Sequence, residues 1–179
     1  MSIAEKYRPH YTYDDYCLWE GRWELIEGMP YAMSPAPTPR HQMVLTSLVD
    51  IFFNGLKRCP DCRVFVAPLD WKINNTTVVQ PDLLIICKPI EKKYLDFSPS
   101  LVAEVISPST AEKDRIIKYE IYKEAGVKYY LLIEPVTNKI TSYTLADKEY
   151  VMQKPIGNSY QFHFDEKCSP YFDFENLWV

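Results

Sequence analysis

The sequence predicts a mixed α/β fold of the α+β kind, in which helices pack on a largely central, mixed sheet. Three observations predict it: an N-terminal hairpin signal, two stretches with helical spacing of apolar residues, and short apolar segments between and after them. The chain has 179 residues, of which 47% are hydrophobic and 25% charged, and this suits one well-filled core. We therefore expect a single domain over residues 1–179, with its core at about 22–145.

A hairpin and a long helix are predicted first. Two short strand signals, at 23–26 and 31–33, flank a turn that contains glycine. Thr38 and Pro39 have the pattern of a helix cap followed by proline at the first helical position. The helix is expected over about 39–57 because apolar residues recur at helical spacing, namely Val44, Leu45, Leu48, Ile51, Phe52 and Leu56.

Strands and a second helix follow. Four strand signals lie at residues 63–67, 70–73, 78–87 and 101–106. The last of these is apolar on both faces apart from one glutamate, as expected of a central strand. Ser109 and Glu112 form a capping-box pattern that opens a helix, which ends near Gly126. Further strand signals precede a tail rich in proline and aromatic residues, at 129–133, 140–145 and 150–153.

Charge and composition narrow the classes of function. The formal net charge is -4 at pH 7, so the chain is not a bulk-electrostatic nucleic-acid binder, although a local basic patch and a bound cation can act against the global sign. An aromatic share of 15% indicates a partner surface as well as a core, and we expect a homodimer. Because the chain has no apolar run of about 20 residues and no N-terminal signal core, we expect a cytoplasmic protein without a membrane partner.

The five cysteines form no dense spacing framework; they are Cys17, Cys59, Cys62, Cys87 and Cys168. In a cytoplasmic protein, they are expected to be reduced thiols. Cys59 and Cys62 form a CxxC, which can indicate zinc or redox chemistry. A zinc site needs two further ligands, and the other cysteines show no paired spacing, so we interpret the CxxC as a coincidence in a loop. A small redox or zinc protein built on this pair is a competing function.

Two acidic residues lie inside apolar runs. Asp82 precedes a run of four aliphatic residues, and Glu104 is the one charge in segment 101–106. An ionised carboxylate in such a setting costs several kcal/mol unless a partner or a metal balances it. Two carboxylates on adjacent buried strands, with Lys118 on the following helix, suit a divalent-metal phosphodiesterase site. The competing interpretations are a turn cap for Asp82, a buried ion pair for Glu104, and a surface i,i+4 pair with Asp114 for Lys118.

Several motifs occur together in an order that matches one known family. They are Trp23-Glu24-Leu25-Ile26-Glu27-Gly28, Met33-Ser34-Pro35, Pro39-Arg40-His41-Gln42, Val79-Gln80-Pro81-Asp82-Leu83, Glu104-Val105-Ile106-Ser107-Pro108-Ser109-Thr110, Asp114-Arg115, Lys118, Tyr122, Ala125-Gly126-Val127, Tyr129-Tyr130 and Glu134-Pro135. In combination they resemble the Uma family of "putative restriction endonucleases", within the PD-(D/E)XK nuclease superfamily. The resemblance implies a restriction-endonuclease-like αβββαβ core with an N-terminal hairpin and added C-terminal strands.

The same resemblance implies that Asp82, Glu104 and Lys118 are catalytic. In the usual (D/E)-x-K pattern, the lysine follows the acidic residue by two positions. Here Ile106 stands at that position. Lys118, on the next helix, is therefore the candidate for the displaced lysine.

Metal ligands and phosphate contacts are implied as well. The cofactor would be Mg²⁺ or Mn²⁺, held by the two carboxylates and the backbone carbonyl of Val105. Glu24, from the N-terminal part, is an additional candidate ligand. His41 and Arg40, in the first turn of the long helix, are candidates for contacts with substrate phosphate.

Two functions therefore compete for this fold. The first is a metal-dependent endonuclease that hydrolyses phosphodiester bonds, with double-stranded DNA as the expected substrate. The second is a catalytically silent protein of the same fold that serves as a DNA-binding or protein-docking module. The acidic net charge and the 14 tyrosines favour the second, whereas the buried carboxylates favour the first.

Overall fold

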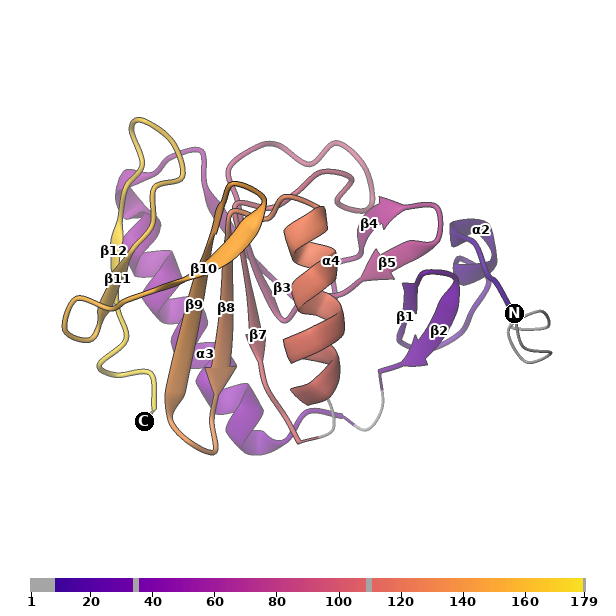
Figure 1. The fold of residues 1–179 in the computed structure, drawn as a ribbon, viewed down its shortest axis with the longest axis horizontal. Helices are drawn as coiled ribbons and strands as arrows, with labels where there is room; N and C mark the ends of the chain where they lie inside the picture. Colours follow the sequence, from indigo (N-terminus) through magenta and orange to yellow (C-terminus); the bar gives the residue numbers. More distant parts are fainter. Residues whose placement is uncertain (1–8, 34–35, 109–110, 179) are drawn as a thin grey trace.

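A six-stranded mixed sheet forms the centre of the fold in the computed structural model, which describes residues 9–33, 36–108 and 111–178 (Figure 1). The strand order is β10-β9-β8-β7-β6-β3. The bounds are β3 (Arg63–Val66), β6 (Leu83–Ile86), β7 (Leu101–Val105), β8 (Tyr129–Glu134), β9 (Lys139–Ala146) and β10 (Glu149–Gln153). Only β7 and β8 pair in parallel in this sheet, because a helix crosses over between them.

Helices cover both faces of this sheet (Figure 1). Helix α3 (Pro39–Gly55) packs on one face, and helix α4 (Lys118–Glu124), preceded by the π-helical turn η2 (Lys113–Ile117), packs on the other. Side chains alternate between the faces along each strand. In β7, Ala103 packs on the α3 side and Val102 on the α4 side. Apart from two strands between β3 and β6 that join a second sheet, the order α3-β3-β6-β7-α4-β8 is the predicted αβββαβ core, and the mixed α/β prediction is confirmed.

A second, four-stranded sheet lies beside the first and has the order β2-β1-β5-β4. Its strands are β1 (Trp23–Ile26), β2 (Met29–Ala32), β4 (Trp71–Asn74) and β5 (Thr77–Val79), with the short helix α2 (Tyr13–Tyr16) before them. The predicted hairpin is confirmed as β1 and β2. Its turn residues Glu27 and Gly28 have φ of 48° and 77°. Gly28 has a second reason to lack a side chain, because a Cβ there would lie 2.2 Å from Nδ1 of His10.

The prediction of one strand over residues 78–87 is wrong. The segment forms β5 and β6, which belong to different sheets and are separated by residues 80–82. Pro81 has no N–H to donate to a sheet ladder, so the chain leaves one sheet there and enters the other. Leu83 pairs with Ala103 across β6 and β7, and continuing this register places Asp82 opposite Glu104.

The first helix begins where the cap pattern predicts. Thr38 Oγ1 accepts a hydrogen bond from the His41 N–H at 3.2 Å, and Pro39 occupies the first turn. The α-helix ends at Gly55, and a 3₁₀ turn, η1 (Leu56–Arg58), completes the predicted length. Ser109, part of the predicted capping box, lies outside the described residues. None of the helices in the described part of the chain is long and apolar enough to cross a membrane.

The C-terminal tail contains two strands that the sequence did not predict, β11 (Ser159–Gln161) and β12 (Tyr171–Asp173). They pair with each other and pack on α3, on the side away from α4 (Figure 1). The ring of Phe172 meets the ring of Phe52 at 4.7 Å between centroids. At Gly55, a Cβ would lie 2.4 Å from Cε1 of Phe172, so the close approach of tail and helix depends on glycine.

The prediction of free thiols is wrong for four of the five cysteines. Cys59 is bonded to Cys168, and Cys62 is bonded to Cys87. Within the described residues, Cys17 is the free cysteine, and it is exposed. The second bond follows from register: Arg63 pairs with Ile86, so Cys62 and Cys87 stand opposite each other just beyond the ladder. The CxxC is therefore not an isolated loop feature.

Candidate active site

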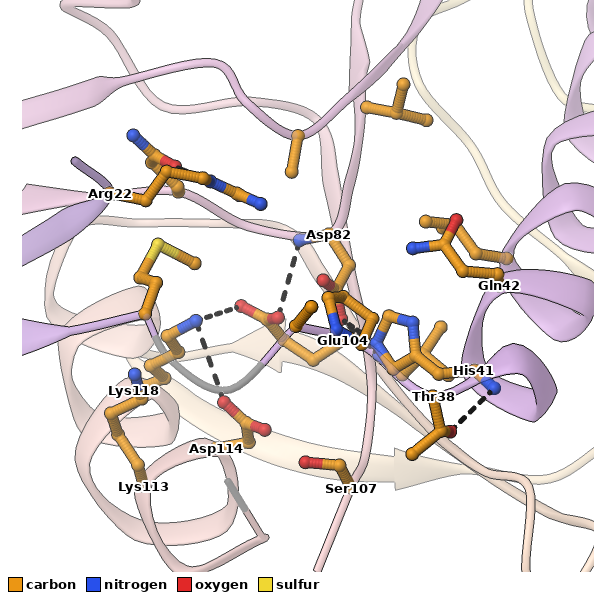
Figure 2. Close-up of a pocket in the computed structure, with 18 of the residues that line it drawn as sticks. Arg22, Thr38, His41, Gln42, Asp82, Glu104, Ser107, Lys113, Asp114 and Lys118 are labelled. Atoms are coloured by element: carbon orange, nitrogen blue, oxygen red, sulfur yellow. Dashed lines mark hydrogen bonds and ion pairs between the residues drawn. The ribbon is translucent and has the colours of Figure 1, made fainter. Parts of the chain in front are cut away.

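Asp82 and Glu104 meet at the end of the ladder between β6 and β7 (Figure 2). The Val105 N–H donates to Asp82 Oδ2 at 2.9 Å, and the Asp82 N–H lies 3.4 Å from Glu104 Oε2. Glu104 faces the α4 side of the sheet, because the neighbouring residue of the same parity, Val102, packs there. The strand pairing thus brings the two carboxyl groups together, and a backbone N–H group contacts each of them.

Lys118 completes the trio predicted from the sequence. Its Nζ lies 2.8 Å from Glu104 Oε1, 3.1 Å from Glu24 Oε1 and 3.6 Å from Asp114 Oδ1, and its side chain is 3% exposed. Figure 2 shows the lysine reaching toward Glu104 and Asp114 from the helix. The pair with Asp114 is therefore real but buried, and it coexists with the contact to Glu104.

The π-helical turn before α4 brings further charges to the site. In this turn, the Lys118 N–H is bonded to the carbonyl of Lys113, five residues earlier. Asp114 is 2% exposed, and Lys113 Nζ lies 2.5 Å from Glu24 Oε2. Sequence reasoning did not place Lys113 at the site, and it named Asp114 only within the family motif and as the i,i+4 partner in the competing interpretation of Lys118. The sequence feature that could have indicated a buried Asp114 was its i,i+4 spacing with Lys118. That spacing does not distinguish a surface pair from a buried pair.

Burial and neighbouring charges set the protonation of these groups. Burial disfavours the charged form of Lys118, but Glu104, Glu24 and Asp114 outweigh it and raise the pKa of the ammonium well above its ordinary value. Burial, with added repulsion from Asp114, Asp82 and Glu24, raises the pKa of Glu104 to about 8, although Lys118 acts in the opposite direction. Tyr122 donates to Glu104 Oε1 at 2.6 Å. Lys118 therefore remains protonated, and burial shifts the carboxyl of Glu104 toward its protonated form when no cation is bound.

Glu24 links the second sheet to the site. Its side chain is fully buried, and its Oε1 accepts the Gln80 N–H at 3.0 Å. Burial alone would raise the pKa of this carboxyl, but Lys118 and Lys113 outweigh burial and lower it. Gln80 is held in turn by the guanidinium of Arg22, at 3.1 Å from Nη2 to Oε1. Glu24 is therefore an ionised partner of two lysines, and it fixes the segment that leads into Asp82.

His41 reaches the site, whereas Arg40 does not. His41 is 7% exposed, and its Nε2 lies 3.2 Å from Asp82 Oδ2. Its Nδ1 is buried without a hydrogen-bond partner among the described residues, so the tautomer that donates from Nε2 to the carboxylate satisfies the contact. Arg40 instead donates to the carbonyl of Trp178 at 3.2 Å and to Asn138 Oδ1 at 3.3 Å. It is not among the described residues that line the cavity.

These groups line a solvent-connected cavity of about 830 Å³. Its walls come from the β1–β2 hairpin region, the first turns of α3, the ends of β6 and β7, and the η2 turn, and they include Arg22, His41, Asp82, Glu104, Asp114 and Lys118. Among the residues that the structure describes, no group of three or more His, Cys, Asp or Glu side chains is arranged to hold a metal ion. A hard cation that keeps several waters needs one or two carboxylates, and Asp82 and Glu104 meet that smaller requirement.

A family comparison agrees with this geometry. The family model Uma2, described as "Putative restriction endonuclease", matches residues 12–166. The chain belongs to the Uma2 family. The Uma2 match spans every site residue above, whereas Cys168 and β12 lie beyond it.

Two relatives and a solved structure are also similar to this chain. The "Uncharacterized protein slr1290" of Synechocystis sp. (strain ATCC 27184 / PCC 6803 / Kazusa) is 32% identical over 143 residues, which are 75% of this chain and 74% of that protein. The "Uncharacterized protein sll1609" of the same organism is 27% identical over 111 residues, 57% of this chain and 62% of that protein. A crystal structure titled as "a putative nuclease belonging to DUF820 from Anabaena variabilis ATCC 29413" aligns with a TM-score of 0.67 at 18% identity, over 79% of this chain and 83% of that one. This likeness confirms the restriction-endonuclease-like fold.

Proposed function

We propose that the chain is a nuclease that uses Mg²⁺ or Mn²⁺ to hydrolyse phosphodiester bonds in double-stranded DNA. One observation carries the proposal: Asp82, just before β6, and Glu104, on β7, approach each other in an open cavity, where Lys118 Nζ lies 2.8 Å from Glu104. Phosphodiester hydrolysis needs charge neutralisation at phosphate and a positioned water. Membership of the Uma2 family supports nuclease chemistry at this position.

The charges around the cavity favour a bound cation. The inner cluster contains four carboxyl groups and two ammonium groups, so full ionisation leaves two negative charges unbalanced; its members are Glu24, Asp82, Glu104, Asp114, Lys113 and Lys118. The raised pKa of Glu104, to about 8, has its origin in burial and in this surplus. A proton on Glu104 would remove one of the two unbalanced negative charges, whereas a bound divalent cation would offset both. Asp82, Glu104 and the Val105 carbonyl would hold that cation, which would polarise the phosphate and lower the pKa of a coordinated water.

The remaining side chains have separate roles in this proposal. Lys118 stabilises negative charge on the phosphate, and its raised pKa makes it unsuited to act as a general base. His41 orients Asp82 through the 3.2 Å contact. Glu24 is a weaker ligand candidate, because each of its oxygens already lies within 3.1 Å of a lysine nitrogen. Arg40 would need to leave its contacts with the C-terminal segment to reach a phosphate.

Plasmid cleavage tests the proposal. Purified protein should nick or linearise supercoiled DNA with Mg²⁺ or Mn²⁺ and not with EDTA, and Asp82→Asn or Glu104→Gln should reduce the rate at least about 100-fold. Glu120→Gln is the matched control, because it removes one carboxylate from the exposed side of α4. Single-stranded RNA and DNA oligonucleotides distinguish the substrate class. Metal-dependent cleavage that Asp82→Asn retains at full rate would overturn the assignment.

A silent nuclease-fold module is the second candidate. The observation that favours it is the contact of Lys118 with three carboxylates, because an ammonium in that position already offsets part of the charge that a metal would balance. Calorimetric titration with Mn²⁺ separates the two functions. No measurable binding, together with intact DNA in every assay, would select the silent module.

A further inference from the structure

Four cysteines converge on the α3 face of the large sheet, opposite the face that carries the charged cluster. They come from three segments: Cys59 and Cys62 lie in the connection between η1 and β3, Cys87 follows β6, and Cys168 precedes β12. The sulfur atoms of the two disulfides also touch, because Cys62 Sγ lies 3.8 Å from Cys168 Sγ. The CxxC brings one cysteine of each disulfide together, and Cys87 and Cys168 reach the same place from distant parts of the chain.

One sulfur–sulfur separation, that between Cys62 and Cys168, is the length of an edge of a tetrahedral metal centre. With a Zn–S bond of about 2.3 Å, the edge of a ZnS₄ tetrahedron is about 3.8 Å, which is the separation between the two disulfides. Cys59 and Cys62 form the CxxC half of such a site. The N–H of Cys62 bonds to the carbonyl of Cys59 at 3.1 Å, so the two residues already stand in a tight turn. Cys59, Cys62 and Cys168 are each 3% exposed, as in a closed structural site.

We propose that the reduced form of this protein binds one Zn²⁺ through Cys59, Cys62, Cys87 and Cys168. A dithiol or phosphine reductant supplies two electrons to each S–S bond, and with two protons for each bond four thiols form. Zn²⁺ then forms four Zn–S bonds and releases the four thiol protons. The structure describes the disulfide form, in which the four cysteines offer no thiolate and the described residues form no ready-made metal site. The disulfide state and the zinc-bound state therefore exclude each other.

Basic residues adjoin every one of the four cysteines. Arg58 precedes Cys59, Arg63 follows Cys62, Lys88 follows Cys87 and Lys167 precedes Cys168. A zinc ion with four thiolates carries a net charge of -2, and neighbouring cations both offset it and favour the thiolate form. Arg63 stands close to the cluster, since its Nη1 lies 2.9 Å from the carbonyl of Cys62.

The zinc site would fasten the C-terminal segment to the core. Cys168 is carried by the segment between β11 and β12, while the other three ligands belong to the end of α3 and to the β3–β6 edge of the sheet. Four protein ligands leave no open position for a substrate, so the site is structural. The proposal goes beyond the phosphodiesterase chemistry and is independent of it, because the cysteines lie outside the cavity that contains Asp82 and Glu104.

Metal content in the two redox states tests the proposal. Full-length protein kept in a phosphine reductant, given Zn²⁺ and then freed of excess metal by gel filtration, should retain about one zinc per chain. Co²⁺ in place of Zn²⁺ should give the visible absorption of a tetrahedral thiolate complex. The same protein after oxidation should retain no zinc and should show one free thiol, that of Cys17. This comparison uses the wild-type chain and so does not depend on a variant that folds.

Variants assign the ligands. Cys168→Ser and Cys59→Ser should lower zinc retention about tenfold or more, and Cys17→Ser, which alters the exposed free cysteine, should leave it unchanged. Circular dichroism reports whether each variant remains folded. Reduced wild-type protein that retains no zinc would overturn the proposal, as would a folded Cys168→Ser variant that binds zinc as tightly as the wild type.

Discussion

The ammonium of Lys118 contacts three buried carboxyl groups, and these contacts determine its role. Sequence reasoning offered either a catalytic lysine or an ordinary pair with Asp114. The structure contains both contacts, at 2.8 Å to Glu104 and 3.6 Å to Asp114. Because the pKa of Lys118 is raised, the group is a positive charge in the folded state, and in the proposed nuclease it would also face the anionic substrate.

Removal of that charge should destabilise the protein. Lys118→Met leaves Glu24, Glu104 and Asp114 buried without their shared cation, and we expect the free energy of unfolding to fall by about 3 kcal/mol. Mg²⁺ should restore more stability to this variant than to the wild type, because the unbalanced negative charge is larger. Urea denaturation in EDTA and in Mg²⁺ measures both effects. Lys123→Met, which removes a pair with the exposed Glu120, should change stability by less than about 1 kcal/mol.

Glu104 should make metal-free stability depend on pH. Its pKa is about 8 in the folded protein and 4.5 ordinarily, so between these values the folded chain holds a proton that the unfolded chain has released. The free energy of unfolding should therefore fall as pH rises through this window, by at most about 1.4 kcal/mol for each pH unit. Urea denaturation in EDTA measures the slope, and Glu104→Gln should flatten it. Equal slopes in the two proteins would contradict the assignment.

Elements with local signals were predicted correctly, and elements that depend on distant partners were not. The β1–β2 hairpin and α3 follow from a turn glycine and from the Thr38 cap. The split at Pro81 was missed because the sequence does not state which sheet receives each half of an apolar run. The disulfides were missed for the same reason, since Cys62 and Cys87 become neighbours only through the register of β3 and β6. Strands β11 and β12 are three residues long each, too short for a periodic signal.

The packing of the C-terminal strands on α3 can be tested at Gly55. Gly55→Ala places a Cβ 2.4 Å from the buried ring of Phe172, and overpacking of this kind costs about 1–3 kcal/mol. Because the contact is so short and the ring is buried, we expect a cost in the upper part of this range, above the gain of about 1 kcal/mol in helix propensity. Thermal or urea denaturation should therefore show a less stable protein. Asn54→Ala, at the exposed neighbouring position, should be within about 0.5 kcal/mol of the wild type. A stabilised Gly55→Ala variant would mean that the tail does not pack on this helix.

On the scale of the whole molecule, the large sheet separates two kinds of chemistry. Its α4 face carries the buried charges, and its α3 face carries the sulfur cluster and most of the tail. The two outer strands, β3 and β10, leave sheet edges that can pair with another chain. A single domain, a cytoplasmic location and a homodimer all stay predictions from the sequence.

The homodimer prediction points to the β10 edge. Val151 and Met152 on this outer strand are 56% and 62% exposed, and apolar side chains on an edge strand favour pairing between chains. Light scattering should give the mass of a dimer for the wild type and of a monomer for Val151→Lys. Val136→Lys is the matched control, because Val136 is 83% exposed in the turn between β8 and β9. A wild-type monomer, or a dimer that Val151→Lys leaves intact, would exclude this interface.

Strand β7 also limits how the chain can change in length. Ala103 and Val105 face one side of it and Glu104 the other, so the insertion or deletion of one residue within the strand would turn the carboxyl group into the apolar layer under α3. The same event would turn two apolar side chains toward the buried charged groups on the α4 side. A mutation of this kind would therefore remove the acidic group from the site and disrupt the fold at the same time. Variation in length can accumulate only in the connecting segments, such as residues 87–100 between β6 and β7.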